Sequence, residues 1–199
     1  MSDAEQHKQD MKKLQAEQRA KTRDLVDPER GLVLVHTGNG KGKSSSAFGV
    51  ATRALGWGRR VGVVQFIKGK WKTGERQYFE SHDGVEWHTM GDGFTWDTQD
   101  KDQDKLAAEA AYSKAKAMMA SGDFDLVILD EINIAMRYDY LDTDDVIAGL
   151  DARSSNTAVI LTGRDAKPAL LEYADLVSEM VEVKHPFKSG IKAQRGIDF

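Results

Sequence analysis

The residues best suited to chemistry form a turn rich in glycine and lysine at positions 38–45, which we call the glycine loop. Alternating glycines allow successive backbone N–H groups to curl around an anion, and a helix that starts at the end of the turn adds its positive dipole. Lys43 adds a full charge, and the Ser44 hydroxyl is placed to reach a magnesium ion. The loop predicts a phosphate site built from Gly38, Asn39, Gly40, Lys41, Gly42, Lys43, Ser44 and Ser45.

The glycine loop departs at one position from the usual P-loop string G-x-x-x-x-G-K-[ST]. Thr37 stands where that string has its first glycine. The alternative is an ordinary strand-to-helix turn that binds nothing, but such a turn does not need three alternate glycines with two lysines and two serines. We therefore expect a nucleotide site.

Two carboxylates follow a buried strand later in the chain and supply the second half of such a site. Asp130 and Glu131 end the run Phe-Asp-Leu-Val-Ile-Leu at 124–129. A buried strand that ends in acid places a carboxylate at the sheet edge near the phosphates, where it can hold Mg²⁺ (or Mn²⁺) directly or through water. A capped strand end is the alternative for this string alone. With the glycine loop it predicts a metal site that uses Ser44, Asp130 and Glu131.

Three further stretches could contribute to the site. Arg164 follows an expected strand and could contact phosphate, or pair with Asp165 or a neighbouring helix instead. The basic loop 68–74 follows another strand, and its lysines either face the site or lie in solvent. Phe94 and Trp96 lie in a glycine-flanked loop, where they are either anchors to the core or a platform for a planar ligand.

Composition excludes several function classes. The 199 residues are 40% apolar, enough for one well-buried α/β domain, and the formal net charge of −4 gives no basic field for nucleic acid. The absence of cysteine excludes disulfides, thiolate metal sites and cysteine nucleophiles, and it is compatible with a reducing cytoplasm. No apolar run approaches the roughly 18 residues of a membrane span. We expect a cytoplasmic protein with neither nucleic-acid nor membrane partners.

The elements that must position these residues alternate between strand and helix. Strands are expected at 31–35, 61–67, 85–90, 124–130, 157–162 and 176–183, and helices at 45–55, 75–81, 102–120, 141–152 and 167–173. The order predicts an α/β, P-loop NTPase-like (RecA-like) three-layer fold with a mainly parallel sheet of about six strands. The basic stretch 184–199 is expected to be a loop-like cover.

Residues 1–30 form a segment of different composition, with seven basic and seven acidic residues. Met11 and Leu14 are spaced for one helix face, so a mobile helix fits, but a solvated tail fits equally well. Asp27-Pro28 separates this segment from the rest, because proline disfavours helix at the preceding residue. The expected organisation is a mobile N-terminal helical segment at 1–30 and a P-loop α/β domain at 31–199.

A set of short motifs along the whole chain resembles the P-loop corrinoid adenosyltransferases. The motifs are Gly-Asn-Gly-Lys-Gly-Lys-Ser at 38–44, Val-Gln-Phe-Ile-Lys-Gly at 64–69, Gly-Glu-Arg at 74–76, Gly-Phe-Thr-Trp at 93–96, Leu-Asp-Glu at 129–131, Thr-Gly-Arg at 162–164, and Val-Lys-His, Lys-Ala-Gln and Gly-Ile-Asp near the end. The family carries threonine where Thr37 stands, so this position is a mark of the family. Ser44, where threonine is usual, is the visible departure.

The resemblance implies that Co(I) of a corrinoid attacks the 5′ carbon of ATP and releases triphosphate. The corrinoid acceptor would be cobalamin, cobinamide or cobyrinic acid a,c-diamide. The loop residues would hold the triphosphate, Ser44 and Glu131 would engage Mg²⁺, and Asp130 would support the metal or its waters. A small P-loop ATPase or kinase is the alternative.

The resemblance also implies roles outside the phosphate site. Phe94 and Trp96 resemble the aromatic pair that packs beneath the corrin ring and keeps the lower axial ligand off cobalt, which makes Co(I) accessible to a biological reductant. The resemblance further implies a homodimer, in which the N-terminal helix of one subunit covers the site of the other. An electron-donating flavoprotein reductase is a further expected partner.

Overall fold

The computed structural model describes residues 3–67, 73–89 and 101–199, and its centre is one parallel sheet. The strands are β1 (Val33–Thr37), β2 (Val61–Gln65), β3 (Val85–Thr89), β4 (Leu126–Asp130), β5 (Ala158–Thr162) and β6 (Leu176–Glu179). They lie in the order β3-β2-β4-β5-β1-β6, and every pairing is parallel. The predicted α/β, P-loop NTPase-like fold class is confirmed.

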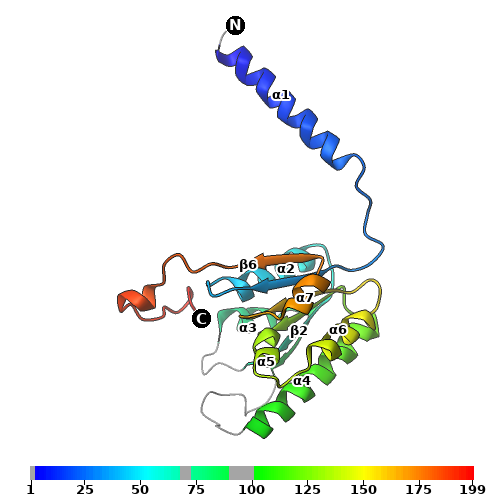
Figure 1. Ribbon diagram of the computed structural model, residues 1–199, viewed down its shortest axis with the longest axis vertical. Helices are drawn as coiled ribbons and strands as arrows, with labels where there is room; N and C mark the ends of the chain where they lie inside the picture. The colour runs from blue at the N-terminus through cyan, green and yellow to red at the C-terminus, as the bar shows by residue number, and fades with distance from the viewer. Residues whose placement is uncertain (1–2, 68–72, 90–100) are drawn as a thin grey trace.

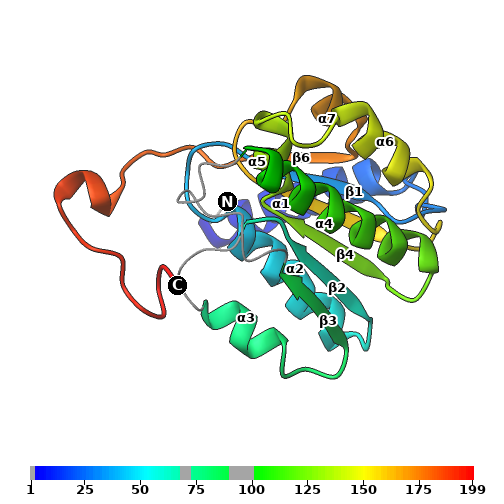
Figure 2. The ribbon, with the colours of Figure 1, turned by 90° about the horizontal axis from the view of Figure 1, so that it is seen from below.

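Helices cover both faces of this sheet (Figures 1 and 2). The covering helices are α2 (Lys43–Gly56), α3 (Gly74–Phe79), α4 (Lys101–Ser121), α5 (Ile132–Arg137), α6 (Thr143–Asp151) and α7 (Pro168–Tyr173). The helix α1 (Asp3–Thr22) precedes the sheet, and the 3₁₀ helix η1 (Pro186–Ser189) follows it. α2 and α3 lie on one face, and α4 to α7 lie on the other. The three-layer arrangement follows from strands that are apolar on both sides.

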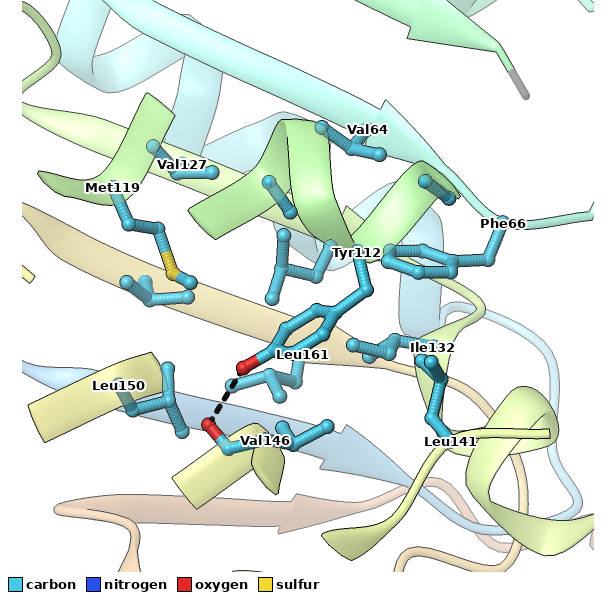
Figure 3. Packing of buried hydrophobic residues seen from close by; sticks show 14 of the residues in the cluster. Val64, Phe66, Tyr112, Met119, Val127, Ile132, Leu141, Val146, Leu150 and Leu161 are labelled. Carbon is cyan, nitrogen blue, oxygen red and sulfur yellow. Dashed lines mark hydrogen bonds between the residues drawn. The ribbon is translucent and has the colours of Figure 1, made fainter. Parts of the chain in front are cut away.

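The central strand β4 shows how the two halves of the core divide. All five of its residues are buried, and successive side chains point to opposite faces. Ile128 packs with the α2 side, whereas Val127 and Leu129 belong to the larger cluster under α4, α6 and α7. Figure 3 shows this larger cluster, where Tyr112 of α4 lies among apolar side chains and reaches α6.

The strand order also decides what meets at the sheet edge. β5 lies between β1, which leads into the glycine loop, and β4, which ends at Asp130. Because all strands are parallel, their carboxyl ends share one edge of the sheet, where open α/β folds bind ligands. The glycine loop and the carboxylates are therefore separated by the width of one strand.

The two ends of the chain lie outside the layered domain. α1 is exposed along its whole length and projects away from the sheet in Figure 1. After β6, the segment 180–199 leaves the sheet and returns toward the glycine loop, where it lines the cleft described below. Within the described ranges, no helix has both the length and the apolar character that crossing a membrane requires.

Two short elements were not expected from the sequence. α5 starts directly after Glu131, and η1 lies in the stretch expected to be only a loop. β6 is also shorter than expected, since it ends at Glu179 and not at 183. α5, η1 and β6 are each at most six residues long. Hydrophobic periodicity is recognised over longer windows, so it gives little indication of elements this short.

Candidate functional site

The glycine loop is shaped by two residues that only glycine suits. Gly42 has φ 113° immediately before the first residue of α2, a conformation that side chains disfavour. Gly38 has φ 94°, and a Cβ there would lie 2.5 Å from the carbonyl oxygen of Met180. The loop is also tied to the chain leaving β6, because the Gly40 N–H donates to Met180 O at 2.6 Å. The loop is thus held in place by Met180, the residue that follows the last strand.

Lys43 is buried within the loop rather than extended into solvent. Only 7% of the residue is exposed, and its Nζ donates to Gly40 O at 2.7 Å. Burial lowers the pKa of Lys43, although nearby Glu131 opposes the shift. The ammonium group therefore stands inside the curl of the loop, where a phosphate would add negative charge.

Asp130 is almost completely buried and is surrounded by hydrogen-bond donors. Gln65 Nε2 donates to Oδ2 at 3.1 Å, and Thr162 Oγ1 donates to Oδ1 at 2.8 Å. Burial raises the pKa of Asp130, while hydrogen bonds with Ser44, Thr162 and Gln65 oppose the shift. The bond with Ser44 links the glycine loop directly to the end of β4.

Glu131 occupies a left-handed conformation, with φ 63° and ψ 21°. Its Oε2 atom is buried and has no hydrogen-bond partner among the described residues. Burial raises the pKa of Glu131 to about 7, with Asp130 adding to the shift and Lys43 and Arg164 opposing it. An unpaired buried oxygen of this kind is a feature to be explained by a ligand or by function.

These groups line one cleft of about 560 Å³. Its walls are formed by Lys41, Gly42, Lys43, Ser44, Ser45, Phe48, Gln65, Ile67, Thr73, Glu75, Asp130, Glu131, Ile134, Arg137, Tyr138, Arg164, Ile197 and Asp198. Polar and charged residues from the glycine loop face the carboxylates, and apolar residues from α2, α5 and the end of the chain complete it. The volume lies within the range of small-molecule sites.

Comparison with known proteins gives the family. The model of the family described as ATP:corrinoid adenosyltransferase BtuR/CobO/CobP matches residues 29–199. The chain belongs to this family. The match supports ATP-dependent adenosyl transfer to a corrinoid over the ATPase or kinase alternative, and it confirms the resemblance found in the motifs.

Individual relatives of this adenosyltransferase family match over nearly the whole chain. A corrinoid adenosyltransferase of Pseudomonas aeruginosa is 51% identical, over 98% of this chain and 96% of its own length. One of Escherichia coli K12 is 51% identical over 86% of this chain and 87% of its own length. The corrinoid adenosyltransferase CobA of Salmonella typhimurium is 48% identical over 90% of this chain and 94% of its own length.

The structure brings together most residues that the sequence singled out in this adenosyltransferase. Lys41 to Ser45, Asp130, Glu131 and Arg164 line the same cleft, whereas Gly38 and Gly40 lie behind it against Met180. Asn39 lines a neighbouring cavity of about 440 Å³ that Arg164 also borders. Phe94 and Trp96 lie outside the described residues, as do 68–72 of the basic loop.

Arg164 is exposed and borders both cavities. The alternative partner considered for it, Asp165, instead forms an ion pair with Arg137 of α5 at 2.8 Å. Among the described residues no ion pair of Arg164 is found, and the residue lines both cavities. The position is compatible with a phosphate contact.

Two residues that line the cleft, Gln65 and Asp198, and one buried residue behind it, Thr162, were not singled out from the sequence. Gln65 and Thr162 are the last residues of β2 and β5, and both bond Asp130. Their motifs were noted, but only the strand order shows that they meet one carboxylate. Asp198 approaches the glycine loop from the other end of the chain, and no local pattern signals that contact.

The donor set suits a divalent cation that arrives with a nucleotide. Within the described ranges, no cluster of three or more His, Asp and Glu side chains could hold a metal alone. The unpaired Glu131 Oε2 and the nearby Ser44 hydroxyl provide two oxygen positions beside the phosphate loop. Mg²⁺ is typically held by one or two carboxylates together with substrate phosphates, which matches this arrangement.

Proposed function

We propose that this cleft binds ATP with Mg²⁺ and that the cobalt of a reduced corrinoid attacks the 5′ carbon of the ATP there. Co(I) supplies the electron pair of the new Co–C bond, and the pair of the breaking C–O bond leaves with triphosphate. The observation that carries the proposal is the glycine loop facing Asp130 and Glu131 across one cleft. The family assignment supports carbon, and not phosphorus, as the electrophile.

The chain's own groups account for triphosphate as a leaving group. Lys41 and Lys43 place two positive charges on the loop, and the N-terminus of α2 adds its dipole. Donors already in place when negative charge develops lower the barrier without reorganisation. In this role the loop stabilises the departing oxygen and needs no general base.

The metal is proposed to be held by Ser44 and Glu131, with Asp130 as the supporting carboxylate. When bound, Mg²⁺ would neutralise triphosphate charge. Asp130 is fully committed to donors from Gln65, Thr162 and Ser44, so it suits support, whereas Glu131 Oε2 is unpaired and suits direct contact. Metal binding would require the ionised form of Glu131 and would release its proton.

The direct test is a reaction of the protein with MgATP and chemically reduced cob(I)alamin. We expect a light-sensitive adenosylated corrinoid and one triphosphate per product. A Lys43→Ala variant should lose at least about 100-fold in kcat/KM, since it removes a charge from the transition state. Release of inorganic phosphate without an alkylated corrinoid would instead indicate an ATPase or kinase.

The corrinoid side of the site is proposed to include Phe94 and Trp96. An aromatic pair that keeps the lower axial ligand off cobalt would matter for reduction but not for alkyl transfer. Phe94→Ala and Trp96→Ala should therefore lose more activity with Co(II) and a flavoprotein-type reductant than with chemically prepared Co(I). Equal losses in both assays would contradict this role.

A homodimer with a shared site is proposed for the N-terminal segment. α1 has no buried residue, and its two large apolar side chains, Met11 and Leu14, are 42% and 57% exposed, which supports a partner for that face. A variant lacking 1–24 and the Lys43→Ala variant should each be inactive alone, and their mixture should regain activity if the helix of one subunit acts on the site of the other.

We further propose a cytoplasmic setting with an electron-donating flavoprotein, which fits the reduced cobalt and the lack of cysteine.

A further inference from the structure

We propose that Thr162 is a positioning residue, whose hydroxyl sets the geometry of both carboxylates that serve the metal. This inference rests on the proposed function, because it concerns the ATP-bound cation. Thr162 is completely buried at the end of β5, between the glycine loop and the end of β4. It therefore does not reach solvent, and its polar atom must be satisfied inside the protein.

The direction of its two hydrogen bonds follows from chemistry. The backbone N–H of Glu131 donates to Thr162 Oγ1 at 2.9 Å, and an N–H can only donate. The hydroxyl must use a lone pair for that bond, so its single proton is free for Asp130 Oδ1, which lies 2.8 Å away. One hydroxyl thus holds the side chain of one carboxylate and the main chain of the next.

The bond to Glu131 acts where the chain is strained. Glu131 has φ 63°, a left-handed conformation that is unfavourable for a residue other than glycine. The first turn of α5 is also held by a hydrogen bond, since Asn133 Nδ2 donates to Gly163 O at 3.0 Å. The end of β5 and the residue after it therefore hold the start of α5 at Glu131 and Asn133. The consequence is a Glu131 side chain whose Oε2 stays buried and unpaired beside the cleft.

Strand register explains why a hydroxyl is needed at this position. Leu129 of β4 is paired with Leu161 of β5, so Asp130 and Thr162 follow as neighbours at the ends of adjacent strands. Valine has nearly the same shape as threonine but can neither donate to Asp130 nor accept from Glu131. The substitution would leave both partners short of a bond in a buried place.

The chain offers a matched control in Thr157, the residue immediately before the first residue of β5. Thr157 is also completely buried, and its Oγ1 donates to Phe124 O at 2.7 Å. Thr157→Val removes a buried hydroxyl of the same kind far from the cleft. A purely structural role for Thr162 would make Thr157→Val and Thr162→Val behave alike.

The experiment compares wild type, Thr162→Val, Thr162→Ser and Thr157→Val by Mn²⁺ electron paramagnetic resonance with ATP and without corrinoid. We expect Thr162→Val to weaken Mn²⁺ binding about 10- to 100-fold, as loss of an outer-sphere partner does. Thr162→Ser should stay within about 3-fold of wild type, because it keeps the hydroxyl. Thr157→Val should bind Mn²⁺ as wild type does, although urea unfolding shows a stability loss like that of Thr162→Val.

Steady-state kinetics add a second readout. Thr162→Val should need a higher Mg²⁺ concentration for half-maximal rate, while the KM for the corrinoid stays unchanged. Unaltered Mn²⁺ binding in Thr162→Val, or failure of serine to restore it, would overturn the inference. If Thr162→Val does not fold, Thr162→Ala makes the same comparison with a smaller side chain. Adenosyl transfer by wild type tests the proposed function separately.

Discussion

The carboxylate of Asp198 forms an ion pair with Lys41 of the glycine loop, across 157 positions of the chain. The backbone N–H of Gln194 also donates to Asp198 at 2.8 Å, and both contacts hold the pKa of Asp198 below its usual range. The Asp198 carboxylate thus neutralises the charge of a lysine that lines the cleft. Triphosphate would compete with it for the same charge.

Asp198→Asn should therefore tighten binding of tripolyphosphate by roughly two- to five-fold, the range expected for removing an exposed ion pair. Isothermal titration calorimetry measures the change, which should shrink at high salt. Asp125→Asn is the matched control, since it removes an equal charge from an exposed pair with Arg59. Weaker binding by Asp198→Asn would mean that Asp198 positions Lys41 for phosphate.

Glu131 should make the free protein less stable as the pH rises. Its folded pKa of about 7 lies above the ordinary value of 4.5, so the folded state holds its proton longer than the unfolded state. Stability therefore falls between pH 4.5 and 7, by about 3 kcal/mol if the shift is fully expressed. The charged groups around it are Asp130, Lys43 and Arg164.

Glu131→Gln should remove this dependence in metal-free, nucleotide-free protein. Urea unfolding at pH 5 and pH 8 is expected to show the variant gaining stability relative to wild type at the higher pH. Glu80→Gln, on an exposed pair with Arg76, should show no such difference. Parallel pH profiles for wild type and Glu131→Gln would contradict the burial of this carboxyl.

Tyr112 joins α4 to α6 through the core (Figure 3). Its hydroxyl lies 3.0 Å from the carbonyl oxygens of both Asp145 and Val146, and only 4% of the residue is exposed. Tyr112→Phe should cost about 1–2 kcal/mol in urea unfolding, because a buried donor is lost while the packing is kept. Tyr78→Phe, at a residue 61% exposed, should change stability by less than about 0.5 kcal/mol. Equal effects would argue against the α4–α6 bond.

Arg30 ties the chain before β1 to the start of β6. Its guanidinium donates to both oxygens of Asp175 at 2.8 and 2.7 Å, and Asp175 also accepts from the Val33 N–H at 2.8 Å. The bond with Arg30 lowers the pKa of Asp175, so this contribution is complete above the unfolded pKa of about 4 and is lost as pH falls through the lower folded value.

Asp175→Asn should lower Tm by roughly 2–4 °C between pH 5 and 8. The gap from wild type should narrow in more acidic buffer, as wild type loses the same interaction by protonation. Asp83→Asn, at an exposed turn, serves as the control. A gap that stays constant down to pH 2 would show that Asp175 acts through its shape and not its charge.

The sequence by itself determined the features that are local. The glycine loop and the Asp130-Glu131 pair each consist of consecutive residues, and strand-helix alternation was enough to predict a parallel sheet whose carboxyl edge brings them together. The motif set led to the adenosyltransferase family in the same way. These features depend on backbone geometry within a few residues, so they can be predicted from the order of residues in the chain.

Only the tertiary structure decided which distant groups surround that site. Gln65 and Thr162 meet Asp130 because β2, β4 and β5 are neighbours in the sheet, and Asp198 meets Lys41 because the end of the chain folds back over the loop. The left-handed Glu131, with its unpaired oxygen, likewise appears only when α5 and β5 are in place. Such contacts arise from long-range packing, and no pattern of neighbouring residues encodes them.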